Sequence, residues 1–308
     1  MFNHLKNEFR QYVAGVVLCL ILPNLSFAAD IKVVDDTRQT IVLHHPAHRI
    51  ISLAPNLTEL LFAAGAGDAV VGVVQYSDYP EAAKKIDRVG SYNALDLEAI
   101  LALKPDLIIA WQSGNPSFII EKLKSLGLTV FLSEPHHFED VASNLERIGR
   151  LSGKEQTAHK ASITFLAEYK RLRMEYADRK KIKVFYQIWN RPLMTINGKH
   201  LISHVLELCG GENVFADLKT LAPSISLESV IVANPDAIIT GGLGNDRAGW
   251  LDDWRKWIQI TAVKYDNLFL VNPDIVQRHT PRILLGVRQV CEKLDLARSR
   301  MAKSYHPD

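Results

Sequence analysis

Two glutamates occupy matching places in two similar stretches of the sequence. Residues 95–111 read LDLEAILALKPDLIIAW and residues 225–241 read ISLESVIVANPDAIITG, so Glu98 corresponds to Glu228. Each lies near the start of an expected helix, where the macrodipole favours a carboxylate by about 0.3–1 kcal/mol. A carboxylate can also pair with a cationic side chain of a partner. The residues alone favour the helix-start role and leave a binding role open.

Histidines gather at two places, and histidine with carboxylates is a common ligand set for zinc and related metals. His44, His45 and His48 precede the first expected core strand, whereas His136 and His137 follow a later one. Both groups fall in expected loops. We therefore interpret them as solvated loop histidines and predict no metal site.

The N-terminal segment has the features of a secretory signal. Lys6 and Arg10 precede the apolar run VAGVVLCLIL, and the following residues end in SFA, which predicts cleavage after Ala28. The run is about half of the roughly 20 residues that span a membrane. Cys19 follows a leucine rather than a small residue, so lipidation is not expected. Residues 1–28 are thus predicted to be absent from a soluble, exported mature protein.

Two cysteines, Cys209 and Cys291, remain after this cleavage. In an oxidising compartment an even pair predicts a disulfide. It would close a loop of about 80 residues and stabilise the fold by roughly 4–5 kcal/mol in the chain-entropy model. Two buried free thiols are the alternative, and the spacing of a zinc site is absent.

Composition and motifs argue against several classes of function. The chain has 308 residues, a net charge of +2 and no basic run, so a nucleic-acid partner is not expected. The nucleophile motif G-x-S-x-G, the Walker loop and H-E-x-x-H do not occur, and residues 240–249 (TGGLGNDRAG) lack the dinucleotide-binding spacing. We predict a non-catalytic protein without a prosthetic group; a secreted α/β enzyme is the alternative.

Strand and helix patterns alternate along most of the chain, which predicts parallel sheets with helices on their faces. Expected strands cover residues 50–53, 69–74, 107–110, 129–132, 183–186, 237–240 and 268–271. One helix is expected to begin near residue 56. Further helices are expected over residues 97–103, 118–126, 201–208, 227–232 and 282–294.

Residues 154–179 interrupt this alternation. They contain no glycine or proline, and apolar residues recur every three to four positions, at Ala158, Ala161, Phe165, Tyr169, Leu172 and Tyr176. This spacing predicts one helix of about 25 residues, about 37 Å long. We therefore expect two Rossmann-like α/β lobes, residues 29–152 and 182–308, bridged by a helix within residues 153–181.

Four segments of the chain resemble the periplasmic substrate-binding proteins of ABC importers for cobalamin, iron–siderophore complexes and haem. The similarity runs from about Arg49 to Leu294, and these segments look most like the cobalamin-binding members. They are APNLTELLFAAGAGDAVVGVVQYSDYP (54–80), LKPDLIIAWQSGN (103–115), VLELCGGENVF (205–215) and RHTPRILLGVRQVC (278–291). The resemblance implies a helical-backbone (class III) fold, a periplasmic location and cobalamin or a related corrinoid as the transported ligand, with haem or an iron–siderophore as the alternative.

The resemblance also implies a ligand cleft between the lobes, at loops that follow strand ends. The family's aromatic contacts match Tyr76 and Trp111, while Tyr92 stands where the family has tryptophan. Trp189 could supply further aromatic surface, since Ala222 replaces another tryptophan. Core packing is the alternative for each aromatic residue.

The segment DIVQR aligns with a ligand-contacting loop of the family. It supplies Asp274, Ile275, Val276, Gln277 and Arg278, with Ile275 and Val276 where aromatic residues are expected. His279 follows directly, and contact with the ligand or coordination of its metal remains open.

In this family each lobe presents one glutamate to basic residues of a membrane permease dimer. The matching positions are Glu98 and Glu228. The resemblance therefore shifts the interpretation of both residues toward permease docking, with the ATPase subunits engaged only through the permease.

Overall fold

A computed structural model describes residues 30–241 and 249–303. The chain separates into two units, Met1–Asp30 and Ile31–Asp308, and the architecture below is that of the second. The expected signal segment with Cys19, and residues 242–248 of the glycine-containing segment, lie outside the described residues. Among the described residues, the structure contains no helix with the length and apolar character of a membrane span.

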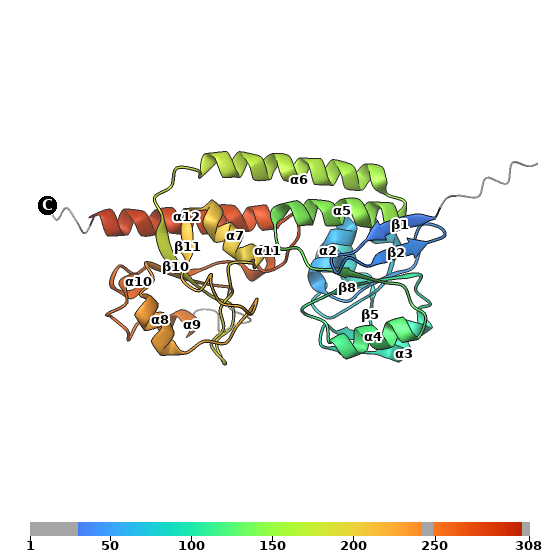
Figure 1. Ribbon diagram of the computed structural model, residues 1–308, viewed down its shortest axis with the longest axis horizontal. Helices are drawn as coiled ribbons and strands as arrows, with labels where there is room; N and C mark the ends of the chain where they lie inside the picture. The colour runs from blue at the N-terminus through green and yellow to red at the C-terminus, as the bar shows by residue number, and fades with distance from the viewer. Residues whose placement is uncertain (1–29, 242–248, 304–308) are drawn as a thin grey trace, which may run out of the picture. The chain divides into compact units, whose positions relative to one another are not determined.

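The first sheet has five parallel strands in the order β5–β4–β3–β8–β9. Figure 1 labels β5 and β8 of this sheet. An antiparallel hairpin of β1 (Ile31–Val34) and β2 (Thr40–Leu43) precedes it, and a shorter one of β6 (Gly90–Ser91) and β7 (Ala94–Leu95) follows β5. The strands are β3 (Ile50–Ser52), β4 (Val70–Val73), β5 (Asp87–Arg88), β8 (Leu107–Trp111) and β9 (Val130–Ser133). The helices are α2 (Pro55–Ala63), α3 (Leu97–Ala102), α4 (Ser117–Ser125) and α5 (Phe138–Ser152), with 3-10 turns η1 (Gly67–Ala69) and η2 (Glu81–Lys85).

The second sheet has four parallel strands in the order β11–β10–β12–β13. The strands are β10 (Ile182–Gln187), β11 (Gly211–Asn213), β12 (Ala237–Thr240) and β13 (Leu268–Leu270). The helices are α7 (Leu201–Leu208), α8 (Leu227–Ala233), α9 (Gly249–Asp252), α10 (Thr261–Lys264), α11 (Pro273–Val276) and α12 (Ile283–Lys303). The expected α/β class with parallel sheets is confirmed.

Successive residues of the internal strands enter different hydrophobic clusters, because successive side chains point to opposite faces of a sheet. In β3, Ile50 belongs to the large central cluster and Ile51 to a cluster under α3 and α4. In β10, Tyr186 faces the central cluster and Phe185 faces a cluster under α8 and α10. Each sheet is therefore buried on both faces, as expected for parallel strands.

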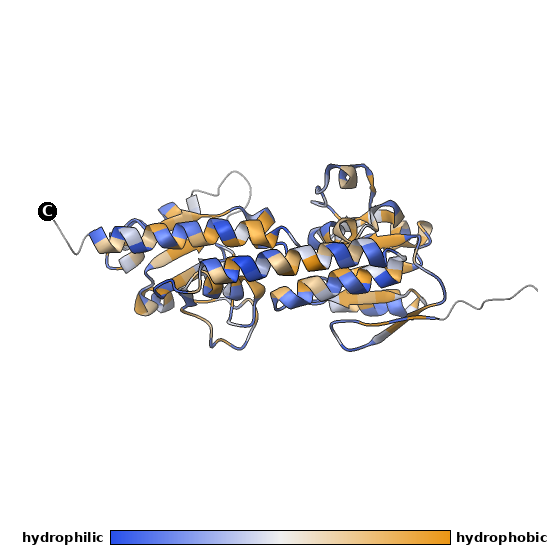
Figure 2. Ribbon diagram, turned by 90° about the horizontal axis from the view of Figure 1, so that it is seen from above, coloured by the Kyte–Doolittle hydropathy of each residue, from blue (hydrophilic) through white to orange (hydrophobic). Residues whose placement is uncertain are grey.

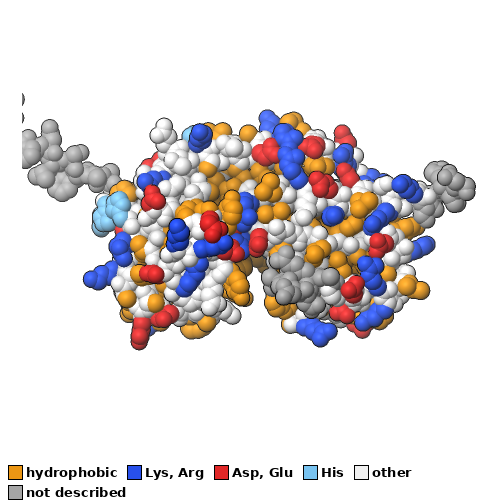
Figure 3. Space-filling view, turned by 180° about the vertical axis from the view of Figure 1, so that it is seen from behind, with side chains coloured by type: hydrophobic (Ala, Val, Ile, Leu, Met, Phe, Trp, Pro, Cys, Tyr) orange, Lys and Arg blue, Asp and Glu red, His pale blue; other side chains and the backbone are white. Residues whose placement is uncertain are grey.

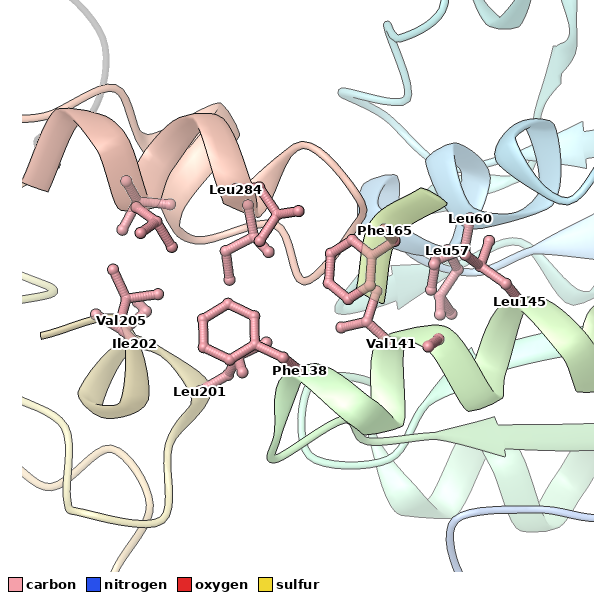
Figure 4. Packing of buried hydrophobic residues seen from close by; sticks show 14 of the residues in the cluster. Leu57, Leu60, Phe138, Val141, Leu145, Phe165, Leu201, Ile202, Val205 and Leu284 are labelled. Carbon is pink, nitrogen blue, oxygen red and sulfur yellow. The ribbon is translucent and has the colours of Figure 1, made fainter. Parts of the chain in front are cut away.

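The central cluster continues from one sheet to the other. Figure 4 shows Phe138, at the start of α5, between Leu201 of α7 and Leu284 of α12, while Val141 lies beside Phe165, and Leu57 of α2 lies near Leu145. The two halves of Ile31–Asp308 thus share one hydrophobic core.

The expected long helix is α6 (Glu155–Glu175), which ends four residues earlier than its periodicity indicated. It lies along α5 and α12 (Figure 1). Hydrophilic and hydrophobic residues alternate along the long helices, whereas the strands are mainly hydrophobic (Figure 2). The lobe boundaries at residues 152 and 182 stay a prediction.

The sequence interpretation missed α5 and ended the last helix too early. The spacing of Phe138, Val141, Leu145 and Ile148 is helical and could have identified α5. The predicted disulfide is present: Cys209, at the end of α7, is bonded to Cys291 of α12, with a sequence separation of 82.

Candidate ligand-binding and docking sites

The predicted ligand residues lie where parallel strands end, the usual ligand position in open α/β sheets. Tyr76 follows β4, Trp111 is the last residue of β8, Trp189 follows β10, and Asp274 lies in α11 after β13. Figure 3 shows the surface hollowed between the parts built on the two sheets, on the side away from α6. Tyr76 is 74% exposed, so it is not a core residue.

Tyr92 and Trp111 form one aromatic surface. Their ring centroids are 6.5 Å apart with a 44° interplanar angle. A Cβ at Gly114 would overlap the Trp111 ring, so glycine is required for this ring position. The Trp111 Nε1 atom is buried without a hydrogen-bond partner among the described residues. Tyr92 is 45% exposed and can contact a ligand.

A buried asparagine that the sequence interpretation did not select holds this pair. The Nδ2 atom of Asn115 donates to the carbonyl of Leu53 at 2.9 Å and to that of Tyr92 at 2.8 Å. Its Oδ1 accepts from the backbone N–H of Trp111 at 2.7 Å. Asn115 therefore joins the end of β3, the β6–β7 hairpin and the end of β8.

Trp189 provides an aromatic surface in the second half of the chain. Its ring packs edge-on against Trp250, with centroids 5.8 Å apart, and its Nε1 donates to the carbonyl of Arg191. It is 41% exposed, whereas Trp250 is buried. Buried Trp254 donates to Oε1 of Gln187 at 2.8 Å, which anchors the segment after β12 to the end of β10.

The five residues of Asp274–Arg278 have different surroundings. Residues 273–276 form the short helix α11 rather than a loop. Val276 is fully buried in the central core, which is a correction to its expected place among surface ligand contacts. Ile275 packs partly against the same core, and Gln277 donates to the Tyr186 hydroxyl at 3.4 Å. Asp274 and Arg278 remain partly exposed.

Arg278 belongs to an ion-pair network between α2 and the start of α12. Its Nη1 donates to Oε1 of Glu59 at 2.9 Å and to Oδ1 of Asp78 at 2.8 Å, and its Nη2 lies 3.0 Å from Oδ1 of Asp274. The hydroxyl of Thr280 donates a hydrogen bond to Oε2 of Glu59, with an oxygen–oxygen distance of 3.0 Å.

Arg282 completes this network. It donates through Nε and Nη2 to Glu59 at 2.9 and 2.5 Å, and its guanidinium lies 3.7 Å from the Tyr79 ring centroid. Burial alone would lower the pKa values of both arginines, but hydrogen bonds to the carboxylates raise them, so both stay charged. No local signal in the sequence identifies Glu59 as part of a network, because its position near a helix start accounts for a polar residue there.

The two repeated stretches have the same local structure. Helix α3 is capped by the Asp96 carboxylate, which accepts from the N–H of Ala99, and α8 by the Ser226 hydroxyl, which accepts from the N–H of Ser229. Each helix leads into an internal strand of its sheet, β8 or β12. Lys104 and Asn234, each directly before proline, both have positive φ, 46° and 43°.

A carboxylate after that proline closes each unit. Asp106 accepts from the backbone N–H groups of His48 and Arg49, and Asp236 accepts from that of Lys183 at 2.8 Å. The apolar positions, the proline and the aspartate of the repeat are thus structural. Glu98 and Glu228 take no part in the contacts that close these units.

Both repeated glutamates are exposed in the first turns of α3 and α8. Figure 1 shows these two helices on the side away from α6, where Figure 3 shows the hollow. Hydrogen bonds from its own backbone N–H and from Ser226 lower the pKa of Glu228, so it is ionised at neutral pH. The position suits contact with a partner, although docking itself stays a prediction.

The histidines form no metal site among residues 30–241 and 249–303. His44, His45 and His48 are exposed, as expected, and His137 caps α5. His279 is buried, 5.1 Å from the His200 ring, with no partner for its Nε2 in the described structure. Burial, with a smaller contribution from His136, lowers the pKa of His279 to about 4.

Two cavities of about 530 and 520 Å³ lie among the helices, and neither is lined by a predicted ligand residue. The first lies between α6, α7 and the start of α5; the second lies between α6, α12 and the end of α2. The predicted ligand residues lie instead where the strands end.

Known proteins share this fold and much of the sequence. A vitamin B12-binding protein of Vibrio cholerae serotype O1 is 40% identical over 258 residues, which are 83% of this chain and 92% of that protein. One from Yersinia pestis is 38% identical over 259 residues, 84% of this chain and 90% of that protein.

Solved structures agree with this likeness. The crystal structure of the periplasmic vitamin B12 binding protein BtuF of Vibrio cholerae matches with a TM-score of 0.76, covering 82% of this chain and 98% of that chain. The periplasmic heme-binding protein RhuT of Roseiflexus matches with a TM-score of 0.73 at 22% identity, which shows a shared fold alone. The family model described as "Periplasmic binding protein" matches residues 50–275. With two parallel sheets, a bridging helix α6 and this match, the chain belongs to the periplasmic binding protein family.

Proposed function

We propose that this chain is the cobalamin-binding component of an ABC importer, which captures cobalamin and delivers it to a permease without catalysing a reaction. The observation that carries the proposal is the 40% identity to the vitamin B12-binding protein of Vibrio cholerae, which extends over 92% of that protein. The aromatic surfaces at the strand ends support the same ligand.

The chemistry of a corrinoid fits the residues at the strand ends. A corrin has a broad apolar rim that carries amide side chains, and large aromatic surfaces with a few polar groups are the usual lining for such a ligand. Tyr76, Tyr92, Trp111 and Trp189 supply exposed or partly exposed aromatic area. Asp274 supplies a partly exposed carboxylate, which Arg278 holds.

The position of the two glutamates supports delivery to a permease dimer. Glu98 and Glu228 are each exposed in the first turn of a helix, one in each half of the chain. Arginine residues of a partner would pair with them and set the orientation of docking. The proposed site of action is the periplasm, with residues 1–28 as the cleaved signal.

Calorimetric titration of the chain without residues 1–28 tests the ligand. We expect one-to-one binding of cyanocobalamin with a Kd below about 1 μM. Haemin is the parallel ligand, because haem is the alternative that the family resemblance implies. Binding of haemin without binding of cyanocobalamin would reject cobalamin as the ligand while leaving the family assignment in place.

A further inference from the structure

Two carboxylates from distant parts of the sequence flank Arg278. Asp78 follows β4 and Asp274 lies in α11, and the guanidinium contacts Oδ1 of each, at 2.8 and 3.0 Å. The Arg278 side chain is 13% exposed, whereas those of Asp78 and Asp274 are 48% and 46% exposed. The positive charge is therefore turned inward and the two carboxylates face outward.

The inner side of this arrangement is held by Glu59. Its buried carboxylate accepts from Arg278 and Arg282, while the carbonyl of Tyr76 accepts from Nη2 of Arg278 at 3.3 Å. The donors of Arg278 thus point to groups of the protein rather than to the solvent. Figure 3 shows acidic and basic side chains together beside the hollow.

The outward carboxylates can accept hydrogen bonds through their second oxygens, because an ionised carboxylate has about four acceptor sites and no donor. Tyr76, two residues before Asp78, has an exposed aromatic side chain, and its backbone carbonyl accepts from the same guanidinium. A ligand with an apolar rim and N–H donors would satisfy both surfaces. A ligand with its own carboxylates would meet like charges in the same place.

We propose that Asp78 is a specificity-determining residue, which together with Asp274 favours a neutral ligand bearing amide N–H donors and disfavours an anionic ligand. Arg278, fixed by Glu59, is the positioning residue that holds the two carboxylates. The proposal rests on the proposed function and deepens it, since corrinoid side chains are amides whereas haem carries propionates.

The test compares Kd values for cyanocobalamin and haemin by titration of wild-type protein and Asp78→Asn. Asparagine keeps the shape and one acceptor oxygen but removes the charge. We expect the ratio of haemin Kd to cyanocobalamin Kd to fall by at least about tenfold, because the variant loses an acceptor for the amides of one ligand and a like charge that faces the carboxylates of the other. Asp78→Asn with Asp274→Asn should lower this ratio further.

Asp87→Asn is the matched control, because Asp87 is an exposed carboxylate of β5 and its loss changes the net charge equally. Its ratio of haemin Kd to cyanocobalamin Kd should equal that of the wild type. A circular dichroism spectrum like that of the wild type checks that each variant is folded.

The outcomes separate the two proposals. If wild-type protein binds cyanocobalamin and the ratio is the same in Asp78→Asn, the role of Asp78 is rejected and the proposed function stands. If wild-type protein binds haemin tightly and cyanocobalamin not at all, both are rejected, because the carboxylate pair then does not exclude an anionic ligand.

Discussion

Glu59 and Arg282 are 223 residues apart in the sequence, yet their side chains form a two-point ion pair. Oε2 of Glu59 accepts from Nε at 2.9 Å, and Oε1 accepts from Nη2 at 2.5 Å. Such a fork-shaped contact fixes orientation as well as distance. Since Glu59 lies in α2 and Arg282 directly precedes α12, the pair ties together the segments that follow β3 and β13.

Replacement of Glu59 by glutamine should therefore destabilise the fold. Glutamine keeps the volume but leaves Arg278 and Arg282 without their shared anion, and removal of one partner from a buried ion pair costs about 3 kcal/mol or more. The measurement is the free energy of unfolding from urea titration. The control Glu81→Gln removes an ion pair whose carboxylate side chain is 81% exposed, so its effect should stay below about 0.5 kcal/mol. Equal effects of the two substitutions would contradict a stabilising role for this network.

Replacement of Asn115 by alanine should weaken ligand binding, although Asn115 itself is not a proposed ligand contact. The three hydrogen bonds of Asn115 position the backbone at Tyr92 and Trp111, and each buried group left without a partner costs about 1–3 kcal/mol. We expect a lower free energy of unfolding and at least about tenfold weaker cyanocobalamin binding.

The exposed Asn93, one residue after Tyr92, gives the matched control. Asn93→Ala removes a hydrogen bond to Ser91 within the same hairpin and should change neither quantity appreciably. Unchanged affinity in Asn115→Ala would mean that the aromatic pair is positioned by other contacts.

The buried histidines should make the protein less stable in mild acid. The pKa of His279 is about 4 in the folded state and near 6.5 when exposed, so between these values the unfolded state binds more protons. Stability contributed by neutral His279 is complete above about pH 6.5 and is lost as pH falls toward 4. Burial also lowers the pKa of His200, which acts in the same direction.

At about 1.4 kcal/mol per pKa unit, His279 alone should lower stability by about 2 kcal/mol between pH 7.5 and pH 5. Urea unfolding at the two pH values measures this slope. In His279→Gln the free energy of unfolding should depend less steeply on pH. Replacement of the exposed His48 by glutamine should leave this dependence as in the wild type. A slope that is identical in all three proteins would assign the acid sensitivity to other groups.

Replacement of Glu98 and Glu228 by arginine should separate docking from ligand binding. Both side chains are exposed and lie in the first turns of α3 and α8, so the fold and the cyanocobalamin Kd should be unchanged. Uptake of radiolabelled cyanocobalamin by cells that depend on this chain should fall at least about tenfold, because the arginines would repel the basic partner residues that the proposed docking requires. Loss of ligand affinity in the purified double variant would argue against a docking role.

The local patterns of the sequence predicted most elements of the fold. Short apolar runs gave the strands, and the three- to four-residue spacing from Ala158 to Tyr176 gave α6, because these periods reflect contacts within one element. The repeated stretches gave two equivalent helix–strand units, and the two cysteines gave the disulfide. The aromatic residues proposed as ligand contacts came instead from the family resemblance, because local periodicity does not single them out.

Only the tertiary structure decided which distant residues meet. Glu59 with Arg278 and Arg282, Asn115 with Leu53 and Tyr92, and His200 with His279 have no periodicity or motif that would join them. Their contacts depend on how helices from both halves pack into one core around Phe138, which is a property of the whole chain. For the same reason Val276, which the alignment placed among ligand contacts, is buried: a side chain's exposure is set by what packs over it, and the sequence near it does not contain that information.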